Sequence, residues 1–101
     1  MKKEIPEFIK AYDNRDNPLY EAVVKVSETA FAGDALDHKT KLLIALALDA
    51  VLGSDHGVAS LARQIRSVGG TDAEINDALR VAYYVAGMNT LVCGNAAFEG
   101  E

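Results

Sequence analysis

Apolar residues recur three and four positions apart along most of this 101-residue chain. That spacing is typical of amphipathic helices, and no segment alternates with the period of two that a half-buried strand requires. The prolines are Pro6 and Pro18, so proline is absent from position 19 onward, as expected for a mainly helical segment. The pattern predicts an all-α fold of about five to six helices without a sheet.

The first third of the chain predicts two helices. A short one starts near Pro6 and is followed by a polar break over residues 13–17. Asn17 then has the side chain of an N-cap, with Pro18 at the first helical position. This second helix would run to about Ala30.

The third helix has an unusual composition. Asp37 is its expected cap, and residues 42–52 are apolar on every side except at Asp49. A helix without a polar face is surrounded by protein. We therefore expect this helix at the centre of the fold or in a subunit interface, ending at Gly53.

Two more helices follow. Ser54 or Asp55 can cap the fourth, and Gly69–Gly70 supplies a left-handed end for it. Thr71 and Glu74 then have the spacing of a capping box at the start of the fifth helix. The buried stripe of the fourth helix is expected at Val58, Leu61, Ala62, Ile65 and Val68. Gly87 is expected to kink or end the fifth helix, and residues 88–98 to form a last short one.

Charge and composition narrow the possible partners. The formal net charge is −5, and the chain has no cluster of Lys and Arg of the kind that binds phosphate backbones or membrane surfaces. The longest apolar run, residues 42–48, is too short to span a bilayer. Hydrophobic residues nevertheless make up 50% of the chain, a high share that suits buried subunit contacts. We expect no nucleic-acid partner and no membrane.

The chain has one cysteine, Cys93, so it cannot form an intrachain disulfide. The first residues, MKKEIPEF, contain no apolar stretch after the two lysines and do not resemble a signal peptide. We expect a cytoplasmic protein with Cys93 as a small buried hydrophobic side chain. A sensor cysteine or an intersubunit disulfide is the alternative.

Residues 37–91 read DHKTKLLIALALDAVLGSDHGVASLARQIRSVGGTDAEINDALRVAYYVAGMNTL. With the apolar third helix, the glycine break and the Gly-Gly-Thr turn, this segment resembles the carboxymuconolactone decarboxylase family, whose relatives include the alkylhydroperoxidase (AhpD-like) disulfide reductases. The resemblance covers roughly residues 34–98 and implies one AhpD-like domain over residues 1–101. It also implies a homo-oligomer, often a trimer or hexamer.

The redox members of that family carry two cysteines three apart at the start of the fourth helix, a histidine four residues further and a glutamate on the preceding helix. The resemblance places these at Ser54, Gly57, Leu61 and near Leu42. All four functional residues are missing here. Serine forms no disulfide and barely ionises near neutral pH, so the family's thiol peroxidase route is not available to this chain. The decarboxylase branch, which also lacks the cysteine pair, acts on a lactone acid.

Asp49 and His56 are the strongest candidates for remaining chemistry. An unpaired carboxylate in an apolar helix is costly, and His56 stands in the first turn of the next helix, where the dipole favours the neutral imidazole. If the two helices meet at an acute angle, Asp49 and His56 could act as a general acid and base. Alternatively, Asp49 pairs across a subunit interface, and His56 is a surface or capping residue.

Other polar residues could complete such a site. Asp55 is a further catalytic candidate, and Ser54, Tyr83 and Tyr84 are candidates for binding substrate. The spacing of the acids with His56 matches no standard zinc or di-iron pattern, so we expect no metal and no cofactor. The basic turn that contains Lys39 can either bind an anion or pair with nearby acids.

Two functions remain open on the sequence. The first is an enzyme of the family that has lost the thiol centre and binds or transforms a small acid or lactone by proton transfer. The second is a non-catalytic oligomeric binding or scaffold protein on the same fold.

Overall fold

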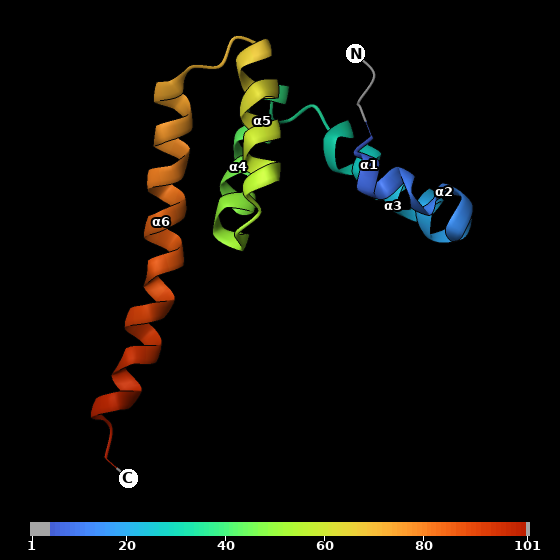
Figure 1. Ribbon diagram of the computed structural model, residues 1–101. Coiled ribbons are helices and arrows are strands. Elements are labelled where there is room, and N and C mark those ends of the chain that lie inside the picture. Colours follow the sequence, from blue (N-terminus) through green and yellow to red (C-terminus); the bar gives the residue numbers. More distant parts are fainter. Residues whose placement is uncertain (1–4, 101) are drawn as a thin grey trace. The chain divides into compact units, whose positions relative to one another are not determined.

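The structure is a computed structural model that describes residues 5–100. It has an N-terminal unit that ends at Leu36 and a C-terminal unit that begins at Asp37 (Figure 1). Every regular element in residues 5–100 is a helix, and no strand occurs among them. The predicted all-α class is therefore confirmed, whereas a single domain over residues 1–101 stays a prediction.

The N-terminal unit consists of α1 (Glu7–Lys10), α2 (Tyr12–Arg15) and α3 (Asn17–Ala32). The short α1 and α2 pack on each other and on α3. The polar break predicted over residues 13–17 is wrong in part, because α2 is helical there. Its polar residues lie on an exposed surface, where a helical turn leaves them solvated.

The predicted N-cap of α3 is also wrong by one residue. Asp16 is the N-cap, and its Oδ1 accepts a hydrogen bond of 3.2 Å from the backbone N–H of Leu19. Asn17 instead donates through Nδ2 to Asp13, at 3.2 Å to the carbonyl oxygen and 3.0 Å to Oδ1. Asp and Asn are nearly equal as N-caps, so the pattern could not separate the two neighbours.

The C-terminal unit consists of α4 (His38–Leu52), α5 (Asp55–Ser67), α6 (Asp72–Gly94) and the 3-10 helix η1 (Asn95–Phe98). α4 and α5 form an antiparallel hairpin, and α4 packs against both α5 and α6 (Figure 1). Within this unit α4 is thus the helix that contacts both neighbours, but Ile44, Leu48 and Leu52 on its other side are exposed, so the prediction that protein surrounds this helix is confirmed for one face only, and the subunit-interface alternative stays a prediction.

A small set of apolar side chains forms the core of the C-terminal unit. Leu42 and Leu46 of α4 are buried, as are Ile65 of α5 and Ile75 of α6. Leu42 and Leu46 lie one turn apart on the same face of α4. Each of the three helices thus contributes to one contact region, in which burying a single large aliphatic side chain stabilises the fold by about 1.5–3 kcal/mol.

The ends of α4 and α5 have the same backbone geometry. Gly53 after α4 has φ +80° and Gly69 after α5 has φ +88°, the left-handed region that glycine adopts without steric cost. After α5, the N–H of Gly69 donates to Arg66 at 3.1 Å and that of Gly70 donates to Ile65 at 2.8 Å. This is a Schellman motif, and it confirms the predicted glycine-ended helix.

The start of α6 also matches its prediction. Thr71 Oγ1 accepts a 3.1 Å hydrogen bond from the N–H of Glu74, and Glu74 Oε1 accepts a 2.9 Å bond from the N–H of Thr71. The expected break at Gly87 is wrong, because α6 continues through it to Gly94. A glycine inside a helix costs about 1 kcal/mol relative to alanine, which does not by itself end the helix.

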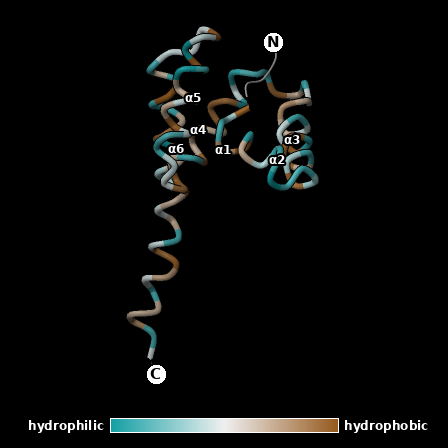
Figure 2. The backbone as a smooth tube through the Cα atoms, turned by 45° about the vertical axis from the view of Figure 1, so that its right-hand side comes forward, coloured by the Kyte–Doolittle hydropathy of each residue, from teal (hydrophilic) through white to brown (hydrophobic). Residues whose placement is uncertain are grey.

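The second half of α6 extends beyond the α4–α5 hairpin (Figure 1). Apolar residues still occur along it at helical spacing, and Figure 2 shows apolar segments among polar ones there. Its exposed large apolar side chains are Val81, Tyr83, Tyr84, Val85, Met88, Leu91 and Val92. Within the C-terminal unit, no described residue buries them.

We expect Thr71→Ala to lower the free energy of unfolding by about 1 kcal/mol, because it removes the side-chain half of the capping box. Denaturant unfolding followed by circular dichroism measures this. Thr90→Ala is the matched control, because the same change at an exposed position inside α6 replaces threonine by a better helix former. Equal losses for the two variants would contradict the assigned role of Thr71.

Candidate functional site

The α4–α5 corner holds the candidate residues Asp49 and Ser54 by main-chain hydrogen bonds. The N–H of Ser54 donates to the carbonyl oxygen of Asp49 at 2.8 Å, and the N–H of Gly53 donates to Ala50 at 3.2 Å. With Gly53 in the left-handed region, this is a second Schellman motif. The turn that ends α4 therefore fixes Ser54 relative to Asp49 before any side chain is considered.

The side chain of Asp49 lies against Gly57 in the first turn of α5. A Cβ atom added to Gly57 would lie 2.9 Å from both Asp49 Cγ and Ser54 Oγ, and closer still to Asp49 Oδ2. The carboxylate and the hydroxyl thus converge on one side of Gly57. This places a proton acceptor and a hydroxyl donor beside the first turn of a helix, where partial positive charge favours an anion.

Asp49 is only partly buried, and its carboxylate accepts no hydrogen bond from a protein donor within residues 5–100. Carboxylates that serve only a structural role in an apolar helix are usually hydrogen-bonded or ion-paired. The carboxylate of Asp49 therefore remains available to a ligand or to a second subunit.

His56 and Asp55 follow Ser54 on α5, and both are exposed. Asp55 Oδ1 accepts a 3.0 Å hydrogen bond from the N–H of His56, so Asp55 provides the local capping contact, whereas Ser54 is the N-cap by position and makes no side-chain cap. The structure shows no hydrogen bond or ion pair between Asp49 and His56 in the described chain. Their pairing stays a prediction.

Tyr83 and Tyr84 lie in α6, with exposed fractions of 82% and 65%. Tyr84 shares a helix face with Val81 and Met88, because these residues lie three positions before it and four positions after it. Tyr83 points to a different face. Neither hydroxyl makes a hydrogen bond with the α4–α5 corner, so the substrate-binding role of the two tyrosines also stays a prediction.

Lys39, in the basic first turn of α4, forms an ion pair with Glu74 of α6. Lys39 Nζ lies 2.7 Å from Glu74 Oε2, with exposed side-chain fractions of 33% and 36%. The hydrogen bond from Lys39, together with the N–H of Thr71, lowers the pKa of Glu74, and the same bond to Glu74 raises the pKa of Lys39. One carboxylate therefore joins the start of α4 to the cap of α6.

Metal binding and thiol chemistry depend on the side chains that could bind a metal ion and on the one cysteine. Residues 5–100 contain no group of three or more His, Cys, Asp and Glu side chains placed to hold a metal ion. The expected burial of Cys93 is wrong in this chain, because Cys93 is exposed in the last turn of α6, where its Sγ lies 3.5 Å from Asn89 Oδ1. No second cysteine exists in the chain to pair with it.

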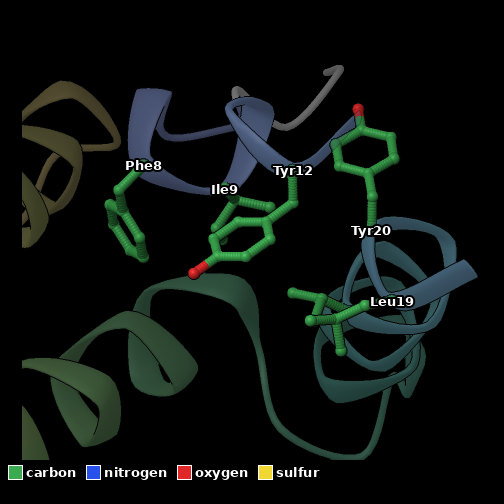
Figure 3. A pocket seen from close by; sticks show the side chains of 6 residues that line it. Phe8, Ile9, Tyr12, Leu19 and Tyr20 are labelled. Atoms are coloured by element: carbon green, nitrogen blue, oxygen red, sulfur yellow. The ribbon is translucent and has the colours of Figure 1, made fainter. Parts of the chain in front are cut away.

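The N-terminal unit contains an apolar pocket of about 210 Å³. Ile9, Tyr12 and Leu19 converge on it (Figure 3), and Arg15 stacks on the Tyr12 ring at 4.1 Å from the centroid. The remaining lining residues are Phe8, Tyr20 and Val23. None of the candidate site residues lines this pocket.

The sequence profile described as "Carboxymuconolactone decarboxylase family" matches residues 17–99. The chain belongs to this family. The match includes parts of both structural units and the whole α4–α5 corner, and it confirms the resemblance seen in the sequence.

Two archaeal relatives are similar over most of the chain. The uncharacterized protein MJ1511 of Methanocaldococcus jannaschii is 35% identical over 88 residues, which cover 87% of this chain and 72% of that protein. The uncharacterized protein MJ0742 of the same organism is 34% identical over 94 residues, which cover 87% of this chain and 88% of that protein. The similarity therefore covers most of this chain and 72% and 88% of the two relatives, whose names assign no activity. Within residues 5–100, no helix has the length and hydrophobicity that a membrane span requires.

The sequence pattern identified Asp49 but missed its contact with Gly57. The available signal was a glycine in the first turn of α5, a helical position where glycine is unfavourable. The second missed contact was between Lys39 and Glu74, which are 35 residues apart. No periodicity argument reaches that far along a chain.

We expect the Lys39–Glu74 pair to stabilise the protein mainly above pH 4.5, the ordinary pKa of Glu74. Because the folded-state pKa is lowered, this stabilisation is complete above the unfolded-state pKa and is lost as the pH falls through the folded-state value. In Glu74→Gln the free energy of unfolding should therefore decrease less between pH 7 and pH 3 than it does in the wild type. Denaturant unfolding between pH 7 and pH 3 measures the slope.

Asp77→Asn is the control for this measurement, because it also removes one carboxylate from α6. Asp77 is 78% exposed and lies 3.7 Å from Arg80, and such exposed ion pairs contribute little to stability. If Asp77→Asn flattened the acid slope as much as Glu74→Gln, the slope would report net charge instead of the pair with Lys39.

Proposed function

We propose that this protein binds a small carboxylic acid or lactone at the α4–α5 corner and moves a proton with the Asp49 carboxylate, without thiol chemistry. The observation that carries the proposal is the position of Asp49. Its unpartnered carboxylate lies beside Ser54 and Gly57, the two positions at which thiol-dependent members of the family have cysteines.

The chemistry at this corner needs no redox centre. An ionised carboxylate accepts a proton from a carbon or oxygen acid, and the protonated form returns it. Ser54 Oγ can donate a hydrogen bond to a substrate carbonyl or carboxylate on the same side of Gly57. His56 is exposed on the first turn of α5 and is the second proposed proton carrier, with Asp55, Tyr83 and Tyr84 as orienting groups. The reaction proposed requires no cofactor and no metal.

We also propose that the working form is a cytoplasmic homotrimer or homohexamer of a single domain over residues 1–101. The support is the amount of apolar surface that the C-terminal unit leaves exposed. α4 contributes Ile44, Leu48, Val51 and Leu52 to it, and the second half of α6 contributes the apolar residues named above. Contiguous exposed apolar surface of this kind marks protein–protein contact sites.

The same surface supports a second candidate function, a non-catalytic oligomeric binding or scaffold protein on the AhpD-like fold. In that case the carboxylate of Asp49 would serve the assembly, by accepting a hydrogen bond from a neighbouring subunit. The two candidates differ in what a loss of the Asp49 charge should change.

For the enzymatic function, we expect Asp49→Asn to reduce turnover of carboxymuconolactone by about 100-fold or more, because positioned acid–base groups contribute factors of that size. His56→Ala should also reduce it. The loss of substrate absorbance measures turnover, and light scattering after size exclusion confirms the oligomer in each variant. An assembly that dissociates on Asp49→Asn would support the structural role, and unchanged turnover would remove Asp49 from the chemistry.

For the assembly, we expect Val85→Asp to shift the protein toward monomers, because it places a charge on the exposed apolar face of α6. Burying an unpaired carboxylate at a subunit contact is unfavourable by several kcal/mol. Sedimentation velocity measures the change. Asn76→Asp is the control, since it adds the same charge at an exposed polar position of α6. A wild-type chain that sediments as a monomer would contradict the oligomer outright.

A further inference from the structure

Gly57 is a helical residue that no turn requires. It lies in the first turn of α5, and its φ is not in the left-handed region. Alanine at such a position would favour the helix. Backbone conformation therefore does not explain why position 57 is a glycine.

The neighbours of Gly57 are the two polar side chains of the corner. A Cβ atom there would overlap the Asp49 carboxylate, with Asp49 Cγ and Ser54 Oγ each at 2.9 Å. Real Cβ atoms essentially never approach other atoms below 3.0 Å. Other helical glycines do not share this property, since a Cβ at Gly87 or Gly94 would have nothing within 4 Å.

We propose that Gly57 is a positioning residue: its missing side chain leaves the space in which the Asp49 carboxylate lies beside Ser54. Any side chain at position 57 displaces the carboxylate by rotation about the Asp49 side-chain bonds. A cysteine at 57 and the carboxylate of Asp49 in its present place therefore exclude each other. The catalytic importance of this position rests on the proposed function. The contact between the Asp49 carboxylate and Gly57 does not depend on that function.

One consequence concerns the thiol route. Two cysteines at positions 54 and 57 can close a disulfide only after the Asp49 carboxylate has moved, because the Cβ atom of a residue at 57 would enter the space that this carboxylate holds. Closing the disulfide is therefore less favourable while Asp49 is present. The corner is thus built either for a carboxylate or for a sulfur pair, and this chain has the first arrangement.

The first test is a thermodynamic cycle. Gly57→Ala is made in the wild type and in Asp49→Ala, and the melting temperature is measured by circular dichroism. We expect the change in melting temperature caused by Gly57→Ala to be more positive in the Asp49→Ala background than in the wild type, by about 4 °C or more for a domain of this size. Gly87→Ala is the matched control and should change the melting temperature equally in both backgrounds. Equal effects of Gly57→Ala in the two backgrounds would overturn the proposal.

A spectroscopic measurement separates positioning from a merely structural role. In protein labelled with ¹³C at the aspartate carboxyl carbons, the Asp49 resonance is identified by its loss in Asp49→Ala. It should shift in Gly57→Ala at constant pH and stay in place in Gly87→Ala. An unmoved resonance in Gly57→Ala would contradict the displacement. This readout is independent of turnover, so an inactive wild type would remove the proposed function and leave the test intact.

The second arm tests the exclusion with sulfur. In a Cys93→Ser background, Ser54→Cys/Gly57→Cys is equilibrated with glutathione disulfide, which accepts two electrons and two protons from the two thiols and leaves as two glutathione molecules. We expect the equilibrium constant for closing the disulfide to rise about tenfold or more when Asp49→Ala is added. Thiol quantification by mass spectrometry measures it. Equal constants with and without Asp49→Ala would overturn the exclusion.

Discussion

The packing of α4 against α5 and α6 is the constraint on which the C-terminal unit depends. Leu42 and Leu46 are almost fully buried between the two neighbours, and α4 is the helix that contacts both. The ion pair of Lys39 with Glu74 links the first turn of α4 to the first turn of α6. The buried face of α4 fixes the orientation of this helix in the unit. The turn that ends α4 then determines the positions of Ser54 and α5 relative to Asp49.

This core is small for the number of apolar residues that the chain contains. Within the described residues, Leu42, Leu46, Ile65 and Ile75 are the buried hydrophobic side chains, whereas Leu48, Leu52 and Leu91 are at least half exposed. A domain of about 100 residues buries a limited share of its surface. Apolar residues that repeat at helical spacing without cover are the support for the oligomer, which is why the oligomer is part of the proposed function.

Much of the fold was readable from local patterns, because helix ends are local chemistry. Asp37, Gly53, Gly69 and the Thr71–Glu74 box all act within five residues of their own position, and each was predicted from the sequence. The errors have the same origin. Asp16 and Asn17 are equivalent as caps in a one-dimensional pattern, and Gly87 has the residue type of a helix end but no partner chemistry that would end α6.

The site was less predictable, because its contacts join different elements. Asp49 was identified by its charge in an apolar helix, but the pattern paired it with His56, whereas the described structure brings it to Gly57 and Ser54. The turn at Gly53 brings Gly57, in the first turn of α5, to the side chain of Asp49, and the pairing of Asp49 with His56 stays a prediction. The residue that determines the position of the carboxylate is therefore Gly57. Composition and charge do not reveal the role of a glycine, because it has no side chain. The role of Gly57 follows from the structure, in which the Asp49 carboxylate occupies the space that a Cβ atom would fill.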